Sequence, residues 1–449
     1  MKKALFIVPH EDDELLVGGG MLLNLVNSKN WEVFVLIATN GDYYPNDCIY
    51  RITESISALN YMGVDSDHVI FLGYGDCWKN THIYNSQAGE ICTSMGGHKE
   101  TYLPIEKEYC FKKNNVHNAY TYDNYQTDLM GVIEDILPEI IFCVDFDSHR
   151  DHRCLSLTFE RVIGKLLCSN LSYNPYILKK FAYENVLMGE YDYFDRCPTI
   201  NLNGNETGNP FLKWEKRICY DIPDNCRTLL IENNFLYKVS KIYKSQRIFI
   251  SAPKYINDDI VYWNRNSNNL LRNAKIISSS GDIHFLNDFM LFDVSDVEKS
   301  ESYDFKKCWI PSVEDLHKEV FITFPTEKSI SLINFFVMIE GGFGELEIKI
   351  FGKNSFFTEG RYKCDKFTVV SIPIQGITVD QLRIQFECNA KFGISEIEVL
   401  EEERVFTEFS YHSHNYKKNL ISIFDKYLFK VKRKIYSYLP SKYGENGDN

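Results

Sequence analysis

The sequence predicts an α/β fold with a mostly parallel sheet and helices on both faces, followed by an all-β sandwich and a C-terminal basic amphipathic helix. Apolar runs alternate with helical segments at the start of the chain, and short period-two runs follow residue 280. A basic stretch ends the sequence. With 449 residues the chain is longer than one ordinary domain, so the sandwich is expected to be separate.

The first part of the chain alternates strands and helices. Short apolar runs without polar alternation predict strands buried on both faces, at 4–8, 32–38, 68–72 and 140–144. Helical spacing predicts helices at 15–27, 50–62 and 128–137, and Gly63 and Pro138 end the last two. This order predicts right-handed crossovers and a Rossmann-like sheet. Residues 77–125 show little periodicity, and we expect them to form a lid or a substrate-binding loop.

A different pattern begins near residue 280, after Ser278–Gly281, which is typical of a linker. In 345–350 and 382–387, apolar and polar residues alternate one by one, as in half-buried strands. Turn residues separate such runs, which predicts a β-sandwich. The expected limits are 1–277 for the α/β domain, 282–402 for the sandwich and 416–449 for the tail.

The tail is basic in an acidic chain. Residues 416–449 hold eight Lys and Arg against three Asp and Glu, a net charge of +5 in a chain of net charge −13. Apolar side chains fall on one helical face: Leu420, Ile421, Phe424, Leu428, Val431 and Ile435. Two interpretations stay open, a helix that packs on the acidic body and peripheral attachment to an anionic membrane.

Composition narrows the class of protein. Hydrophobic residues at 44% and charged residues at 25% indicate a globular chain, and the pI near 5.4 argues against nucleic-acid binding.

The 13 cysteines include no CxxC pair, which favours reduced thiols in the cytoplasm over a disulfide framework. The first apolar run is too short for a signal peptide, and no run approaches a membrane span. We expect a cytoplasmic protein, which membrane attachment through the tail would place at the inner membrane face.

Two loops carry His and carboxylate groups. Pro9–Glu14 follows the first predicted strand, and 145–152 follows the fourth. Loops at the carboxyl ends of parallel strands share one edge of a sheet. Imidazole nitrogens and a carboxylate oxygen with one open position form a catalytic zinc set, although they suit other divalent metals too. Solvated acidic loops are the plainer alternative. Gly18–Gly20 lacks the spacing of a phosphate-binding loop and follows four carboxylates.

These motifs give the chain a specific resemblance. It resembles the PIG-L/LmbE-like family of zinc-dependent de-N-acetylases, which carries P-H-x-D-D-E after its first strand and H-x-D-H-R after a later one. The second motif stands here as 149–153, and the resemblance covers roughly residues 1–275. Glu11 and Arg150 occupy places where proline is usual, which affects the loop shapes but not the ligand positions.

The resemblance implies a metal site and a base. His10, Asp13 and His152 would bind one Zn²⁺ per chain, or another divalent ion. Asp12 would be the general base that takes a proton from water. Two adjacent aspartates permit this division of labour.

The resemblance also implies groups around the metal. His149, when protonated, would stabilise the oxyanion or protonate the leaving amine, and Asp151 would orient it. Arg51 and Asp76 match positions that contact the sugar. The sandwich resembles discoidin-type, galactose-binding-like modules through 393–399. Glycan binding and a packing or dimerising role both stay open for it.

The expected function is removal of the N-acetyl group from an N-acetylglucosamine-type sugar conjugate. One rival is a non-catalytic glycan-binding protein that keeps a structural metal site. Asp12 beside Asp13 argues against it, because a structural site needs no spare base. Another rival is a nucleotide-dependent Rossmann-like transferase. The sequence does not identify the aglycone.

Overall fold

The structure is a computed structural model, and it describes residues 1–44, 47–183, 194, 198–199, 207–299, 302–353, 355–412 and 420–438. The chain divides into two compact units. We call residues 1–156, 177–265 and 407–449 the α/β unit, and residues 157–176 and 266–406 the sandwich unit. The predicted domain limits stay a prediction. The parts of the predicted tail at 416–419 and 439–449 lie outside the described residues.

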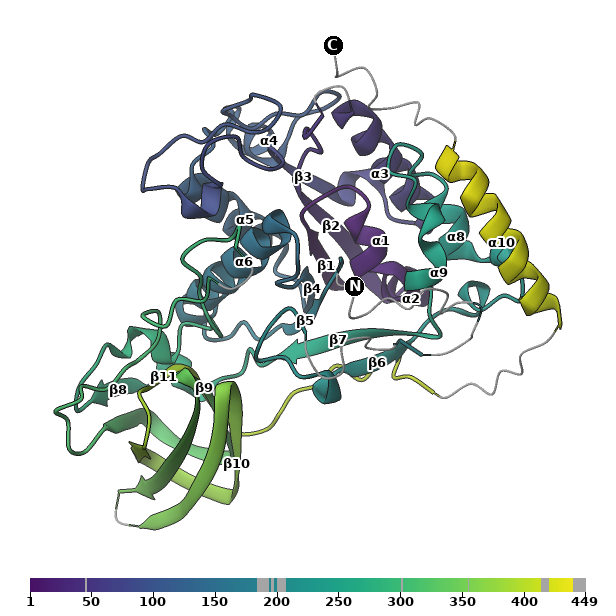
Figure 1. Cartoon of the computed structure of the whole chain (residues 1–449). Helices are drawn as coiled ribbons and strands as arrows, with labels where there is room; N and C mark the ends of the chain where they lie inside the picture. Colours follow the sequence, from purple (N-terminus) through teal and green to yellow (C-terminus); the bar gives the residue numbers. More distant parts are fainter. Residues whose placement is uncertain are drawn as a thin grey trace. The chain divides into compact units, whose positions relative to one another are not determined.

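A mostly parallel sheet forms the α/β unit (Figure 1). Its seven described strands lie in the order β3-β2-β1-β4-β5-β7-β6. The first four in sequence are parallel and buried: β1 (Lys2–Val8), β2 (Trp31–Thr39), β3 (Val69–Tyr74) and β4 (Ile140–Val144). The others add an antiparallel edge, β5 (Tyr176–Lys180), β6 (Ile218–Asp221) and β7 (Asp259–Arg265). The Rossmann-like prediction is confirmed, because the four apolar runs form the parallel centre of this sheet.

The crossover helices lie on both sides of the sheet, α1 to α3 on one side and α5 on the other (Figure 1). They are α1 (Asp13–Val17), α2 (Gly19–Ser28), α3 (Cys48–Met62), α4 (Tyr109–Asn114), α5 (Tyr122–Ile136) and α6 (Arg150–Ser169). Later come α8 (Phe235–Ser240), α9 (Ala252–Tyr255) and α10 (Leu420–Tyr438).

The helix prediction over 15–27 was wrong in detail, and the segment expected to be a long loop contains helical structure. The helix expected over 15–27 is two helices, because Gly19 takes a φ of +36°, which interrupts the helical path. The segment 77–125 is not entirely irregular. It contains α4, and α5 begins at Tyr122 because the side chain of Thr121 caps it by accepting the Asn124 N–H.

The sandwich unit is antiparallel. Its strands are β8 (Lys275–Ser278), β9 (Glu319–Gly352), β10 (Phe356–Cys388) and β11 (Phe392–Leu400). The register shows that the long strands bend between two layers. Residues 382–385 of β10 pair with 319–322 on one edge, and 382–388 pair with 346–352 on the other, whereas 367–373 pair with 332–338. β11 extends that second set by pairing with 332–339. The predicted sandwich is confirmed.

The predicted alternation explains the sandwich core. Leu346, Ile348 and Ile350 are fully buried between polar neighbours on the opposite face. Ser278 ends β8, which pairs with β9, so the expected linker begins inside a strand of this unit.

Two further observations concern the whole chain. Twelve described cysteines are all free thiols, in agreement with the prediction of reduced cysteines. Among the helices that the structure describes, none is long and apolar enough to cross a membrane.

Candidate metal centre

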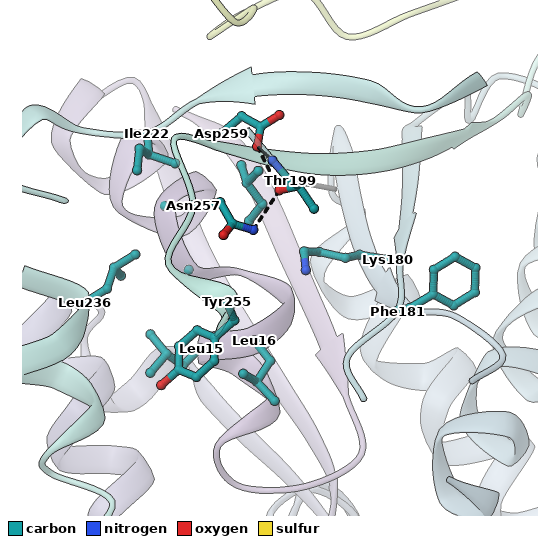
Figure 2. Close-up of a pocket in the computed structure, with 13 residues that line it drawn as sticks. Leu15, Leu16, Lys180, Phe181, Thr199, Ile222, Leu236, Tyr255, Asn257 and Asp259 are labelled. Carbon is teal, nitrogen blue, oxygen red and sulfur yellow. Dashed lines mark hydrogen bonds between the residues drawn. The ribbon is translucent and has the colours of Figure 1, made fainter. Parts of the chain in front are cut away.

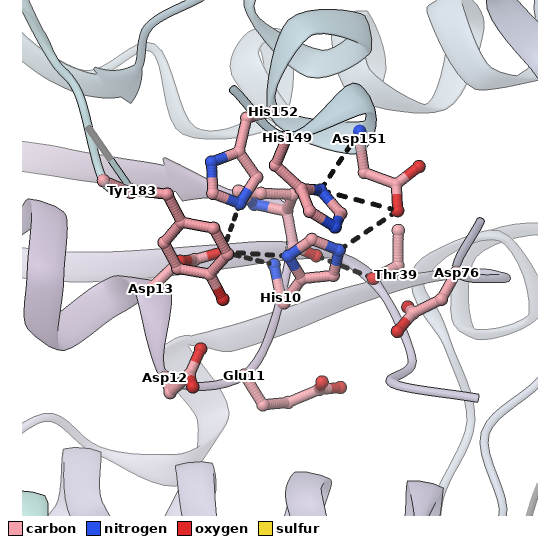
Figure 3. A network of polar contacts seen from close by, with 12 residues as sticks. His10, Glu11, Asp12, Asp13, Thr39, Asp76, His149, Asp151, His152 and Tyr183 are labelled. Atoms are coloured by element: carbon pink, nitrogen blue, oxygen red, sulfur yellow. Dashed lines mark hydrogen bonds and ion pairs between the residues drawn. The ribbon is translucent and has the colours of Figure 1, made fainter. Parts of the chain in front are cut away.

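The two motif loops meet at the carboxyl ends of β1 and β4 (Figure 3). His10 follows β1, Asp13 begins α1, and His152 lies in the first turn of α6. Asp13 Oδ2 lies 3.0 Å from His10 Nδ1 and 3.2 Å from His152 Nε2. All three side chains are buried. The structure therefore brings together the three residues that the sequence singled out as metal ligands.

The atoms of this cluster fit a divalent cation. Asp13 Oδ1 is buried without a hydrogen-bond partner, and His152 Nε2 makes no well-aligned hydrogen bond although it lies near Asp13 Oδ2. Such an atom costs about 1–3 kcal/mol when nothing satisfies it. The rings of His10, His149 and His152 also offer nitrogen atoms within 4.8 Å of one another. Imidazole and carboxylate donors converging in a buried place are the ligand set of zinc and related metals.

A second carboxylate fixes the His152 ring. Asp147 Oδ2 lies 2.8 Å from His152 Nδ1 and accepts the N–H groups of Ala182 and Tyr183. Nδ1 is thereby used, so Nε2 is left to face Asp13. Burial lowers the pKa of His152, but the carboxylates of Asp147 and Asp13 outweigh it and raise that pKa to about 9. Sequence analysis did not single out Asp147, although it lies in the same strand-end loop.

The two adjacent aspartates have opposite proton affinities. Burial and the neighbouring charge of Asp13 raise the pKa of Asp12 to about 8. Burial acts in the same direction on Asp13, but the rings of His152 and His10 outweigh it and lower its pKa. Asp12 also has a φ of 112°, a strained conformation for a residue with a side chain. Such strain is retained where the surroundings require it, and it clusters at functional sites.

His149 and Asp151 stand beside this pair. Asp151 Oδ2 lies 3.2 Å from His10 Nε2 and 4.0 Å from His149 Nδ1, and the Asp151 N–H donates to that same Nδ1. The carboxylate thus faces more than one imidazole. Burial and the adjacent His10 lower the pKa of His149 to about 3, so this ring is neutral near pH 7 in this arrangement.

The segment 77–125 supplies two residues that sequence analysis missed. His82 accepts the Tyr84 N–H at Nδ1, so Nε2 carries the hydrogen and donates to Asp151 Oδ1 at 2.9 Å. The backbone N–H and the thiol of Cys77 both contact Asp151 Oδ2. The stretch 77–125 contains three His and three Cys without periodicity, and no local pattern distinguishes His82 and Cys77 from the others.

Arg51 and Asp76 also lie together at this edge of the sheet. Arg51 Nε is 3.4 Å from Glu11 Oε2, and its Nη1 is 3.7 Å from Asp76 Oδ2. Its Nη2 donates to the carbonyl oxygen of Glu11. Burial raises the pKa of Glu11 to about 8, against the opposing effect of Arg51. Glu11, which stands where the resembled family has proline, is thus a buried partner of Arg51.

A separate small pocket lies between the first helices and β7 (Figure 2). Asp259 accepts both the N–H and the hydroxyl of Thr199 there, and burial lowers the pKa of the nearby Lys180 to about 8. The cavity measures about 30 Å³. That is room for one or two water molecules, too little for a sugar.

One family model matches part of the chain. Residues 5–163 match the model of the PIG-L family, described as GlcNAc-PI de-N-acetylase. No curated protein matches the chain.

Solved structures similar to the chain fall into two groups. N,N'-diacetylchitobiose deacetylase from Pyrococcus horikoshii is 19% identical over 41% of this chain and 62% of that one, with a TM-score of 0.26. The zinc-inhibited form of teicoplanin deacetylase Orf2 is 13% identical over 55% and 86%, with a TM-score of 0.31. A family 32 carbohydrate-binding module from Clostridium perfringens NanJ, in complex with galactose, is 14% identical over 29% and 95%, with a TM-score of 0.23.

Proposed function

Because residues 5–163 match the PIG-L family, we propose that this chain is a metal-dependent de-N-acetylase. It would hydrolyse the N-acetyl amide of an N-acetylglucosamine-type sugar conjugate and release acetate and a free amine. The observation that carries the proposal is the meeting of His10, Asp13 and His152 at the ends of β1 and β4, with Asp12 beside them.

His10, Asp13 and His152 would hold the cation, and zinc is the ion that the donor set favours among several divalent metals. When bound, Zn²⁺ lowers the pKa of a water to about 7 and polarises a carbonyl, which are the two requirements of amide hydrolysis. Asp147 would keep the His152 ring in the orientation that presents Nε2.

Asp12 would take a proton from the attacking water. It is buried beside Asp13, and its pKa of about 8 lies near neutrality, so the ionised form that accepts a proton increases as the pH rises through this range. Its Oδ1 has no hydrogen-bond partner and is therefore free to accept. A structural metal site needs no such group, which favours catalysis over the alternative of a non-catalytic glycan-binding protein.

His149 would act on the other side of the reaction, where its neutral ring would donate a hydrogen bond from Nε2 to the developing oxyanion. A pKa of about 3 does not suit the expected protonation of the leaving amine near pH 7. The His149 side chain is 30% exposed, whereas the Asp151 side chain is only 4% exposed. The imidazole thus has access to substrate, and the buried carboxylate would hold it in place. Arg51, with Asp76 beside it, would hydrogen-bond sugar hydroxyls.

An acetate-release assay tests this function. Full-length protein reconstituted with zinc is screened against N-acetylglucosaminides that carry different aglycones, with the free amine measured alongside acetate. We expect equal amounts of acetate and amine from at least one of them. A protein that binds metal yet releases no acetate from any would support the non-catalytic alternative.

We also propose glycan binding by the sandwich unit, on one observation. A pocket of about 460 Å³ is lined by Phe321, Phe356 and Arg383, and the two phenylalanines are 39% and 55% exposed. Its size suits a small ligand, and its mixed aromatic and polar lining suits a sugar. Phe356→Ala should weaken binding on an immobilised glycan panel, whereas equal binding by both proteins would favour a packing role.

A cytoplasmic location is the proposal that best suits the cysteines. Twelve free thiols in one chain persist most readily in a reducing compartment.

A further inference from the structure

The tail helix α10 is seated on the α/β unit through its polar side. Asp425 accepts the Ile231 N–H at 2.8 Å, and Lys432 pairs with Glu232 at 2.8 Å. The ring of Phe429 lies 6.2 Å from that of Tyr237. In Figure 1, α10 runs along the outside of this unit next to α8. The buried positions of the helix, Ser422, Asp425 and Phe429, fall three and four residues apart and so define one face.

The opposite face is apolar and exposed. Six side chains follow one another at spacings of three and four residues, which places them in a single stripe: Leu420 (84% exposed), Phe424 (70%), Tyr427 (66%), Val431 (56%), Ile435 (55%) and Tyr438 (77%). We call this set the α10 stripe. Ile421, Ile423 and Leu428, at its margins, are also exposed.

This orientation is the reverse of that of an ordinary surface helix. An amphipathic helix on a globular protein turns its apolar side to the core and its charged side to water. Here Ser422, Asp425 and Phe429 face the protein, whereas the α10 stripe and the other exposed apolar side chains of the helix face outward. A contiguous apolar surface of this kind marks an interaction site. The packing interpretation of the tail therefore explains how α10 is attached, but not its outward face.

The charge of α10 indicates which kind of partner the α10 stripe would bind. Residues 420–438 contain five Lys and Arg and the single acid Asp425, in a chain whose net charge is −13. Lys430 and Lys434 are exposed, and helical geometry places them along one edge of the stripe. A basic helix with Phe, Leu and Ile on one face is the type that lies in a membrane interface. A second copy that docked stripe against stripe would place two basic helices side by side, and their like charges would repel.

We propose that the α10 stripe docks the protein on the surface of a membrane rich in anionic phospholipid. The apolar side chains enter the boundary between headgroups and acyl chains, and the flanking lysines meet lipid phosphates. The helix lies in the plane of the surface, because its polar side remains attached to the α/β unit. This proposal does not depend on the proposed deacetylase activity.

Vesicle flotation of the full-length protein tests the proposal. The vesicles contain equal parts of phosphatidylglycerol and phosphatidylcholine, with pure phosphatidylcholine as the comparison. We expect binding to the anionic vesicles that weakens as salt is added. The triple variant Phe424→Ser/Val431→Ser/Ile435→Ser should bind at least ~10-fold more weakly, because it removes apolar area from the interface. Lys434→Gln should lose about fivefold at low salt, the contribution of one surface lysine.

A matched control removes exposed apolar side chains elsewhere. Val313→Ser/Leu316→Ser/Phe343→Ser changes three residues of the sandwich unit that are 88%, 89% and 59% exposed. It should bind anionic vesicles like the unchanged protein. Thermal unfolding of both triple variants should match that of the unchanged protein. Differences in flotation would then report binding and not loss of the fold.

Three outcomes would overturn the proposal. They are an unchanged protein that fails to bind anionic vesicles at low salt, a tail variant that binds as well as the unchanged protein, and a stripe occupied by a second copy. Sedimentation without vesicles detects the last, as a dimer that the tail variant no longer forms. Acetate release from a soluble substrate should be equal in the unchanged and tail-variant proteins, so failure of the deacetylase proposal remains a separate result.

Discussion

The edge of the α/β sheet and the core of the sandwich bury opposite kinds of side chain. At the ends of β1 and β4, Asp12, Asp13 and Asp151 lie within a few per cent of complete burial. In the sandwich the equally buried residues are aliphatic, such as Ile348 and Ile350. Apolar burial contributes about 25 cal/mol per Å² to stability, whereas a buried carboxylate costs free energy unless it is paired.

This difference separates two reasons for being buried. The apolar residues of the sandwich core stabilise the fold by their own burial. The carboxylate cluster persists because the surrounding strands hold it, and it includes the strained Asp12. Substitutions at the cluster should therefore remove activity with little loss of stability, and substitutions in the sandwich core should do the reverse. Variants in the two regions test that contrast.

Asp13→Asn should reduce activity more than any other of these variants. Asparagine keeps the shape but not the charge that faces His10 and His152, so metal and activity should be lost together, by about 10⁴-fold or more in kcat/KM. Metal analysis and acetate release measure the two. Asp67→Asn, at an exposed aspartate, is the matched control and should change neither. Full activity in the Asp13 variant would contradict its role as a ligand.

Asp12→Asn should keep the metal and lose turnover. Asparagine cannot accept a proton from water, so kcat should fall by about 10²–10⁴-fold, the usual contribution of a positioned general base. The same two assays apply. If this variant loses the metal while Asp13→Asn keeps it, the roles of the two aspartates are reversed.

His82→Gln should have a smaller effect. His82 contacts Asp151, which faces His10 and His149, so its loss should reduce activity by roughly 10–100-fold, as expected for an outer partner of a metal site. His68→Gln is the control, because His68 lies just before the start of β3, at the end of that strand away from the site, and pairs with Glu32. Equal activity of the two variants would show that His82 does not support the site.

Ile348→Ala should leave kcat and metal content unchanged and lower the free energy of unfolding. A fully buried isoleucine loses about 2–5 kcal/mol on truncation to alanine. Chemical denaturation measures the loss, and Val313→Ala, at an 88% exposed position, should stay within about 0.5 kcal/mol. A stable Ile348 variant without activity would break the contrast between the two regions.

The two regions also differ in how far the sequence predicts them. The alternation of apolar and polar residues over 345–350 predicts which side chains the sandwich buries, because successive side chains of a strand point to opposite faces. The buried apolar runs predict the parallel centre of the α/β sheet, and the rule for strand ends places His10 near His152. These features depend on local pattern and general topology, which a single sequence carries.

Features set by contacts between distant segments were not predictable. Nothing near His82 indicates that it reaches Asp151, which lies 69 residues further along the chain. The face of α10 that packs depends on Glu232 and Ile231, far away in sequence. Hydrophobic periodicity alone assigns the apolar face to the core, and for α10 that assignment is wrong.

The metal content of the purified full-length protein tests the central claim most directly, namely that the loops after β1 and β4 form one metal site. We expect about one divalent ion per chain, which His10→Ala and His152→Ala should each reduce to a small fraction while the fold, followed by circular dichroism, is kept. Folded variants that retain the same metal content as the unchanged protein would contradict the account.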